Sequence, residues 1–186
     1  MSNLTKVQQS FLDILKEFGV KSEEVLENTP RRATKALGEL LNGEKELNEI
    51  NWKTFDIHEP GELVLIKGIA FQSLCEHHIL PFAGTVSVAY IPSKKVVGLS
   101  KIPRLVKAIS HQLQLQERMT NQIADVLQDK LEPKGIAVYV KAEHACMFMR
   151  GICSTSETVT YTLRNEFKDN QQLRDEFFQC IESERK

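Results

Sequence analysis

The chain lacks several features that would place it in common functional classes. Its 186 residues contain no apolar run long enough to span a bilayer and no apolar signal core near the N-terminus. We therefore expect a cytoplasmic protein with reduced thiols and no membrane partner. A formal net charge of −1 gives no general attraction for nucleic acid. The nine glycines are scattered and form neither a phosphate loop nor a dinucleotide fingerprint.

Cysteine and histidine are also scarce, but they are clustered. Two of the four cysteines and three of the five histidines fall in the segments Cys75-Glu76-His77-His78 and His144-Ala145-Cys146. Thiolate and imidazole are preferred zinc ligands. A structural zinc site needs four protein ligands, whereas a catalytic site needs three and leaves one position for water. Five candidates would therefore allow a catalytic site with two histidines left for proton transfer.

Two other interpretations of these clusters stay open. The spacing contains no Cys-x-x-Cys and no His-x-x-x-His pair, which argues against an ordinary zinc finger. Buried free cysteines beside unrelated histidines would account for either cysteine alone, but poorly for the clustering. The remaining cysteines, Cys153 and Cys180, are assigned no chemistry.

The first part of the chain is predicted to be helical. Apolar residues recur at helical spacing up to Gly19. Thr29-Pro30 predicts the start of a second helix, with threonine as the cap and proline in the first turn, and Gly43 is expected to end it. Residues 44–60 are interpreted as an irregular connector. We therefore divide the chain into a helical arm with its connector, 1–60, and a main domain, 61–186.

The main domain combines strands and helices. Four strands are predicted over 63–71, 84–90, 136–143 and 155–163, with a further short strand over 96–99, and helices after a Ser100 cap and over 115–131 and 170–182. This order predicts an α+β fold with an antiparallel four-stranded sheet, two helices inserted between strand pairs, and an N-terminal helical extension. Helices on one side would leave two sheet edges exposed. Pairing those edges between subunits in a closed ring would remove them.

Seven short motifs, from the second predicted helix to the loop before the last strand, occur in the order found in one enzyme family. They are Thr29-Pro30-Arg31-Arg32, Ser73-Leu74-Cys75-Glu76-His77-His78, Val88-Ala89-Tyr90-Ile91-Pro92, Gly98-Leu99-Ser100-Lys101-Ile102, Leu115-Gln116-Glu117-Arg118 with Thr120 and Gln122, His144-Ala145-Cys146, and Met149-Arg150-Gly151. On these motifs the chain closely resembles GTP cyclohydrolase I.

The resemblance implies a fold, an assembly and a reaction. The fold is the tunnelling fold (T-fold), in which subunits join their sheets into a barrel, and the implied homodecamer consists of two pentamers. The implied reaction is the hydrolysis of GTP at C8 of guanine, with release of formate and rearrangement of the ribose. Its product, 7,8-dihydroneopterin triphosphate, feeds pterin and tetrahydrofolate biosynthesis. The implied cofactor is Zn²⁺.

The resemblance also implies roles for individual residues. Cys75, His78 and Cys146 match the zinc ligands, and His77 and His144 match the catalytic histidines. Glu117 matches the guanine anchor, since a carboxylate can accept from two base hydrogens, and Gln116 is expected to add a base or ribose contact. The implied triphosphate contacts are Ser100, Lys101, Arg104, Arg150 and, from the helical arm, Arg32.

Two other functions are weighed against this one, and the sequence differs from the family pattern at three places. A non-catalytic zinc protein would have no use for the two spare histidines. Other T-fold enzymes, the pterin synthases and the nitrile reductase of queuosine synthesis, use three histidines on zinc or a cysteine nucleophile. The departures from the family pattern are Thr85, the pair His111-Gln112, and the turn Asn165-Glu166, which lacks the usual glycine.

Overall fold

The computed structural model describes residues 4–59 and 62–183. The chain forms two compact units that divide after Asn42. Residues 43–59, interpreted from the sequence as an irregular connector of the arm, thus group with the second unit. They are also partly regular, because they contain helix α3 (Gly43–Asn48) and strand β1 (Thr54–Asp56). No helix in the described ranges is both long and apolar enough to cross a bilayer.

The first unit contains two helices, α1 (Lys6–Glu17) and α2 (Glu23–Leu40). Thr5 and Gln8 form a capping box at the start of α1. The predicted start of the second helix at Thr29-Pro30 is wrong, because Pro30 lies inside α2. Ser22 caps that helix instead and is followed by two glutamates that favour its N-terminal dipole.

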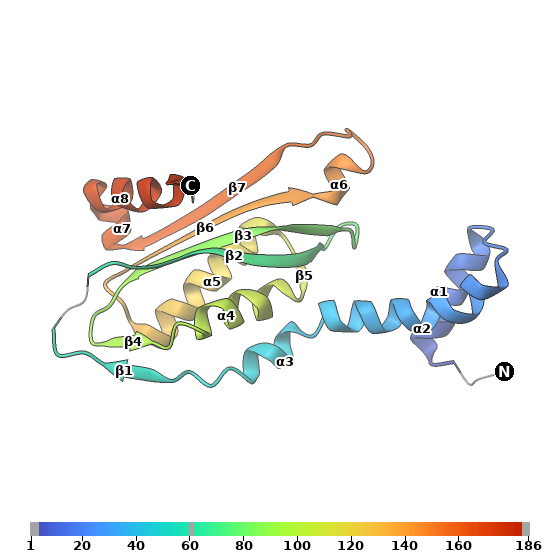
Figure 1. Cartoon of the computed structure of the whole chain (residues 1–186), viewed down its shortest axis with the longest axis horizontal. Helices are drawn as coiled ribbons and strands as arrows, with labels where there is room; N and C mark the ends of the chain where they lie inside the picture. The colour runs from blue at the N-terminus through green and yellow to red at the C-terminus, as the bar shows by residue number, and fades with distance from the viewer. Residues whose placement is uncertain (1–3, 60–61, 184–186) are drawn as a thin grey trace. The chain divides into compact units, whose positions relative to one another are not determined.

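The second unit is built on a five-stranded sheet with the order β5-β2-β3-β6-β7 (Figure 1). Its strands are β2 (Val64–Cys75), β3 (Pro81–Ile91), β5 (Leu113–Gln114), β6 (Gly135–His144) and β7 (Glu157–Asn165). The four long strands pair antiparallel, whereas β5 pairs parallel to β2. The α+β prediction is therefore confirmed, with β5 as an unpredicted fifth strand. Strand β4 (Lys95–Val97) pairs with β1 in a separate two-stranded sheet.

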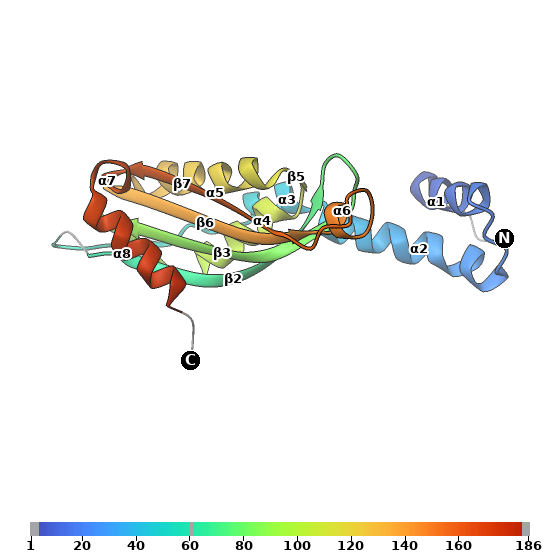
Figure 2. The same cartoon turned by 90° about the horizontal axis from the view of Figure 1, so that it is seen from above.

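Helices cover both faces of the five-stranded sheet (Figures 1 and 2). Helices α4 (Lys101–Ser110) and α5 (Gln116–Leu131) pack on one face, where Val86 and Val88 are fully buried. Helices α7 (Glu166–Asp169) and α8 (Gln171–Glu182) pack on the other, against Ala89 and Ala137. The expectation of helices on one side only is therefore wrong. Strand β3 can bury apolar side chains on both faces because successive residues point to opposite sides, with Val86 and Val88 on one face and Ala89 and Ile91 on the other.

Candidate metal and catalytic site

Three potential metal ligands meet at one end of the sheet. One donor atom each from Cys75, His78 and Cys146 lies within 4.8 Å of the other two, and Cys75 Sγ lies 3.8 Å from His78 Nδ1. Strand β3 brings them together, because it pairs with β2 up to Leu74 and with β6 at His144. Cys75 ends β2, and Cys146 lies in the short helix α6 (Ala145–Phe148) directly after β6. Residues 71 positions apart in sequence thus become neighbours.

The two adjacent histidines lie in a turn. The amides of His78 and Ile79 both donate to the carbonyl of Cys75, and the Cys75 amide donates to Leu80. In an extended segment, adjacent side chains such as those of His77 and His78 would point to opposite sides. The two rings do diverge, at an interplanar angle of 85°, but the turn produces the divergence. Ile79 completes the turn with a φ of 55°, which non-glycine residues rarely adopt.

The cluster fits a tetrahedral metal ion of the zinc type. Zn–S and Zn–N bonds of about 2.3 and 2.0 Å at a tetrahedral angle separate sulfur and nitrogen by about 3.5 Å, close to the 3.8 Å observed here. Burial and the neighbouring Cys75 thiol raise the pKa of Cys146, against smaller opposite effects that include Arg150. Two adjacent thiolates repel each other, and a divalent cation between them would compensate that repulsion.

His144 lies beside the cluster and is held on two sides. Its ring stacks on Phe82 with centroids 4.6 Å apart and an interplanar angle of 3°. Its Nε2 lies 2.7 Å from Gln116 Oε1. Burial lowers the pKa of His144, against the opposing field of the Glu117 carboxylate. The ring is therefore fixed in orientation and favoured in its neutral form.

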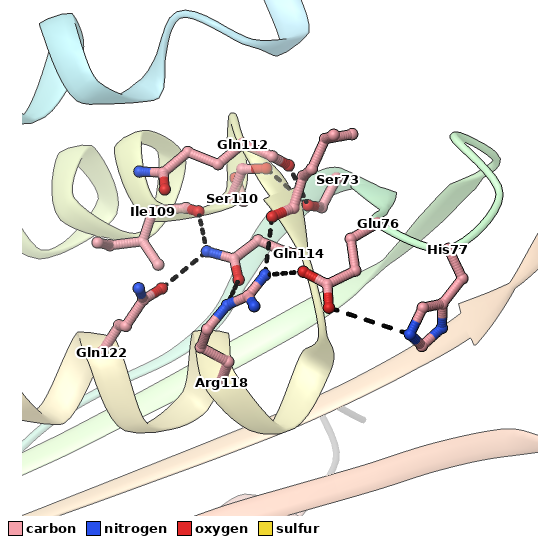
Figure 3. Close-up of polar contacts among 10 residues, drawn as sticks. Ser73, Glu76, His77, Ile109, Ser110, Gln112, Gln114, Arg118 and Gln122 are labelled. Atoms are coloured by element: carbon pink, nitrogen blue, oxygen red, sulfur yellow. Dashed lines mark hydrogen bonds and ion pairs between the residues drawn. The ribbon is translucent and has the colours of Figure 1, made fainter.

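His77 and its neighbour Glu76 belong to a polar network at the start of α5 (Figure 3). Arg118 forms an ion pair with Glu76 and also donates to Gln114 Oε1 at 3.1 Å and to the Leu113 carbonyl at 2.9 Å. Glu76 Oε1 lies 4.0 Å from His77 Nε2, and the His77 side chain is 62% exposed. The network thus ties the turn that carries His77 to helix α5, while the imidazole stays open to a ligand.

Glu117 and Gln116 differ sharply although they are adjacent. Glu117 is exposed in the first turn of α5, and its carboxylate has no hydrogen-bond or ion-pair partner in the described part of the chain. Gln116 is 2% exposed, and its amide nitrogen donates to groups of β6 and β7. Glu117 is therefore available to a ligand, whereas the Gln116 side chain is engaged inside the protein.

Comparison with known proteins agrees with the motifs. The family model for GTP cyclohydrolase I matches residues 7–182. The chain belongs to the GTP cyclohydrolase I family. A protein named GTP cyclohydrolase 1 from Hyperthermus butylicus is 43% identical over 181 residues, which cover 97% of this chain and 92% of that one. Another with this name, from Leptospira biflexa, is 44% identical over 173 residues, which cover 91% and 94%.

Two further comparisons complete this picture. A GTP cyclohydrolase 1 from Campylobacter jejuni subsp. doylei is 46% identical over 164 residues, which cover 87% of this chain and 86% of that one. The solved archaeosine synthase QueF-Like, in its apo form, shares 22% identity at a TM-score of 0.44, covering 56% of this chain and 96% of its own. The family assignment depends on the sequence relatives, and the prediction of a GTP cyclohydrolase I enzyme is confirmed by them.

The residues expected to bind triphosphate in this family are not all gathered at the cluster. Three of them occupy the N-terminal end of α4: Ser100, Lys101 and Arg104. The opposite end of α4 is the one near the cluster, because the carbonyl of Ser110 accepts from Ser73 Oγ at 2.6 Å. Helix α4 has ten residues and so spans about 15 Å. One chain therefore separates these phosphate residues from its own metal ligands.

The other expected phosphate ligands, Arg150 and Arg32, lie in different surroundings, and Ser100 does not act as a side-chain cap. Arg150 is exposed and close enough to Cys146 to affect its pKa. Arg32 lies in the first unit, where it pairs with Glu24 at 3.5 Å. Ser100 does precede α4 as predicted, but its hydroxyl makes no capping hydrogen bond. Lys101 and Arg104 line a cavity of about 400 Å³ together with acidic and basic residues of α3 and α4.

Sequence reasoning missed the residues that support the site. Phe82 and the network of Glu76, Gln114 and Arg118 hold the histidines and the turn, yet none was assigned a role. Glu76 and Arg118 lie inside the motifs that identified the family. Their place in these motifs was the sequence signal that could have pointed to a role in the site. The stacking of Phe82 on His144 depends on strand register, which the motifs do not specify.

Proposed function

We propose that the chain hydrolyses GTP at C8 of guanine with the help of zinc, releases formate, and rearranges the ribose to give 7,8-dihydroneopterin triphosphate. This would be the first step of pterin and tetrahydrofolate biosynthesis. The observation that carries the proposal is the convergence of Cys75, His78 and Cys146 beside His144. Relatives named GTP cyclohydrolase 1, at 43–46% identity, support the choice of GTP as substrate.

Zinc is the metal that this donor set favours. Two thiolates and one imidazole suit a soft to borderline ion in a tetrahedral site, and three protein ligands leave a position open for catalysis. When bound, zinc would act as a Lewis acid and lower the pKa of a water molecule towards neutrality. A purely structural role fits less well, because His144 stands beside the ligands with its Nε2 bonded to Gln116 instead of joining the cluster.

The histidines outside the cluster would move protons. The ring of His77 is exposed, and imidazole can deliver a proton to a guanine nitrogen near neutral pH. His144 is held by Phe82 and Gln116 and favoured in its neutral form, so it can accept a proton from the substrate. Glu117, with its unpaired carboxylate near His144, would accept two hydrogen bonds from the guanine edge.

Binding the triphosphate would require neighbouring subunits. Ser100, Lys101 and Arg104 lie about 15 Å away along α4 from the end near the cluster. A second copy of the chain could present its own α4 to this cluster. Arg150 and an Arg32 from the helical arm would complete the phosphate contacts. This separation supports a pocket shared between copies, and we propose for the assembly the homodecamer of two pentamers that the family resemblance implies.

Exposed apolar surface also supports assembly. Val159 and Tyr161 of the edge strand β7 are 46% and 58% exposed, as expected for a strand that pairs with a second copy. We accordingly propose that the sheets join into the barrel of the T-fold. Light scattering should then give a mass of about ten times the 21.2 kDa of one chain. A fully active monomer would contradict the shared pocket.

A direct assay tests the proposed function. Zinc-loaded protein is mixed with GTP, the product is oxidised, and the fluorescence of the pterin and the amount of formate are measured. We expect equal amounts of formate and pterin, and no pterin from ATP. The Cys75→Ser variant is the matched negative control, whereas Cys153→Ser, an exposed cysteine outside the cluster, should behave as wild type. Absence of formate from the zinc-loaded protein would refute the proposal.

A further inference from the structure

Gln116, the first residue of α5, is buried against β6 and the first half of β7. Its side chain is almost inaccessible, with the residue 2% exposed. Its Nε2 lies 3.2 Å from the carbonyl oxygen of Val140, 3.0 Å from that of Thr158 and 3.2 Å from Thr160 Oγ1. Its Oε1 lies 2.7 Å from His144 Nε2. Since carbonyl oxygens only accept, the amide nitrogen has to be the atom that faces the two strands.

A chain of hydroxyl protons leads to the same orientation. Thr120 Oγ1 donates its single proton to the carbonyl of Gln116 at 2.7 Å. Thr160 must therefore be the donor in its 2.7 Å contact with Thr120. Thr160 then has no proton left and can only accept from Gln116. Two independent sets of partners thus fix the Gln116 amide, and a flipped amide would put its oxygen against three acceptors.

The fixed amide determines the tautomer of His144. Because Gln116 presents an oxygen, the Nε2 of His144 has to carry a hydrogen, and in the neutral ring the other nitrogen is then bare. Nδ1 has no hydrogen-bond partner among the described residues. Stacking on Phe82 prevents the ring from turning freely. His144 is thereby held with one particular nitrogen, Nδ1, ready to take up a proton.

We propose that Gln116 is a positioning residue that holds His144 as the Nε2–H tautomer and so makes Nδ1 the atom that exchanges protons during the reaction. The kinetic part rests on the proposed function, in which His144 transfers protons, whereas the tautomer part does not. Both amide hydrogens of Gln116 are used inside the protein. A contact of its side chain with the base or ribose would therefore have to use the remaining lone pair of Oε1.

The first test reads the tautomer directly. The protein is labelled with ¹⁵N only in its five histidines, and magic-angle-spinning NMR, which is not limited by particle size, measures both ring nitrogens at about pH 8, where imidazole is neutral. The signals of His144 are assigned by their loss in His144→Ala. We expect a protonated Nε2 and a bare Nδ1. A protonated Nδ1 with a bare Nε2 would overturn the proposal, whether or not the protein converts GTP.

Variants then separate positioning from packing. Gln116→Met keeps the bulk but removes the acceptor, so the tautomer preference should be lost and kcat for GTP should fall about 10- to 100-fold, with little change in KM. Gln116→Glu is buried and therefore favoured as the neutral acid, which offers an acceptor and a donor as the amide does. It should retain the Nε2–H tautomer and most of kcat.

Thr160→Val is the matched control. It removes a hydroxyl that contacts the amide nitrogen of Gln116 but keeps the hydrogen bond between Gln116 Oε1 and His144. It should change neither the tautomer nor kcat. A loss in Thr160→Val equal to that in Gln116→Met would reduce Gln116 to a packing role and overturn the proposal. Unchanged kcat and tautomer in a folded Gln116→Met would do the same. If the wild-type protein fails to convert GTP, the proposed function fails, and the nitrogen signals alone decide the tautomer.

Discussion

Removing one thiol from the cluster should release the metal and leave the fold in place. Cys146→Ser substitutes a poor zinc ligand of similar size, leaving Cys75 and His78 as the only protein donors of the cluster. The sheet should persist, because Cys146 only packs against a core whose other members, such as Val86, Val88 and Ile123, are fully buried and unchanged by the substitution. We therefore expect about one zinc ion per wild-type chain and almost none in the variant.

The loss of stability follows from linkage. An ion that binds only the folded state, at a free concentration about 100 times its Kd, stabilises that state by about 2.7 kcal/mol. For a unit of the size of Gly43–Lys186, each kcal/mol shifts Tm by about 2–4 °C. Cys146→Ser should thus unfold about 5–10 °C below the zinc-loaded wild type. It should match wild type treated with a chelator, and chelator should not lower its Tm further.

The assay combines metal analysis of protein purified without chelator with thermal unfolding in the presence and absence of chelator. Cys153→Ser is the control, since this exposed cysteine lies outside the cluster and should keep the full metal content and Tm. Full zinc occupancy in Cys146→Ser would refute the ligand assignment. Equal metal loss in Cys153→Ser would show that the measurement does not report on this site.

The other predictions concern the residues around the cluster. His77→Ala and His144→Ala should keep zinc but lose about 10²–10⁴-fold in kcat, because general acid–base groups contribute that much; loss of metal in either variant would contradict the separate roles. Glu117→Ala should lower kcat/KM for GTP roughly 10- to 150-fold, the equivalent of about 1.5–3 kcal/mol for a hydrogen bond to a charged group, and an unchanged kcat/KM would contradict the guanine contact. A double-mutant cycle on Glu76 and Arg118, 29% and 41% exposed, should give a coupling of about 0.5–1 kcal/mol in urea unfolding, and zero coupling would leave the pair without a role in holding the turn.

Sequence patterns predicted those parts of the fold that local periodicity controls. The alternation in β3 and the apolar face of α5 correspond to the strand and helix observed. Pro30 was misread because a proline signals a helix start only when no better cap precedes it, and Ser22 is that cap. Strand β5 has only two residues, which is too short for any period to be detected. The position of α8 depends on tertiary packing against Ala89 and Ala137, which a strand pattern does not specify.

The residues of the candidate site also divide into those that the sequence could indicate and those that it could not. Chemistry-bearing residues are recognisable because zinc restricts ligand types, so the sequence indicated five candidates, and the family resemblance then implied Cys75, His78 and Cys146 among them. Residues that act through another side chain carry no such restriction. The contact of Gln116 with the base or ribose stays a prediction, but the N-terminal turn of α5 directs this side chain into the sheet and leaves that of Glu117 exposed. Adjacent positions on a helix face different directions, about 100° apart, and the motif alone does not say which of the two is buried.

Within one chain, the expected phosphate ligands and the metal ligands lie apart. Motifs in one sequence are naturally assigned to one pocket, but α4 and β2 run side by side, and this arrangement leaves Lys101 and Cys75 near opposite ends of the pair. A helix of ten residues is too rigid to bring them together by bending. In the shared pocket that we propose, the two groups acting on one GTP molecule come from different copies of the chain. Mixing an inactive Lys101→Ala variant with an inactive Cys75→Ser variant should then restore part of the activity, because some pockets would combine an intact helix with an intact cluster. Two variants that stay inactive after dissociation and reassembly together would place both groups in the pocket of a single chain and contradict the shared site.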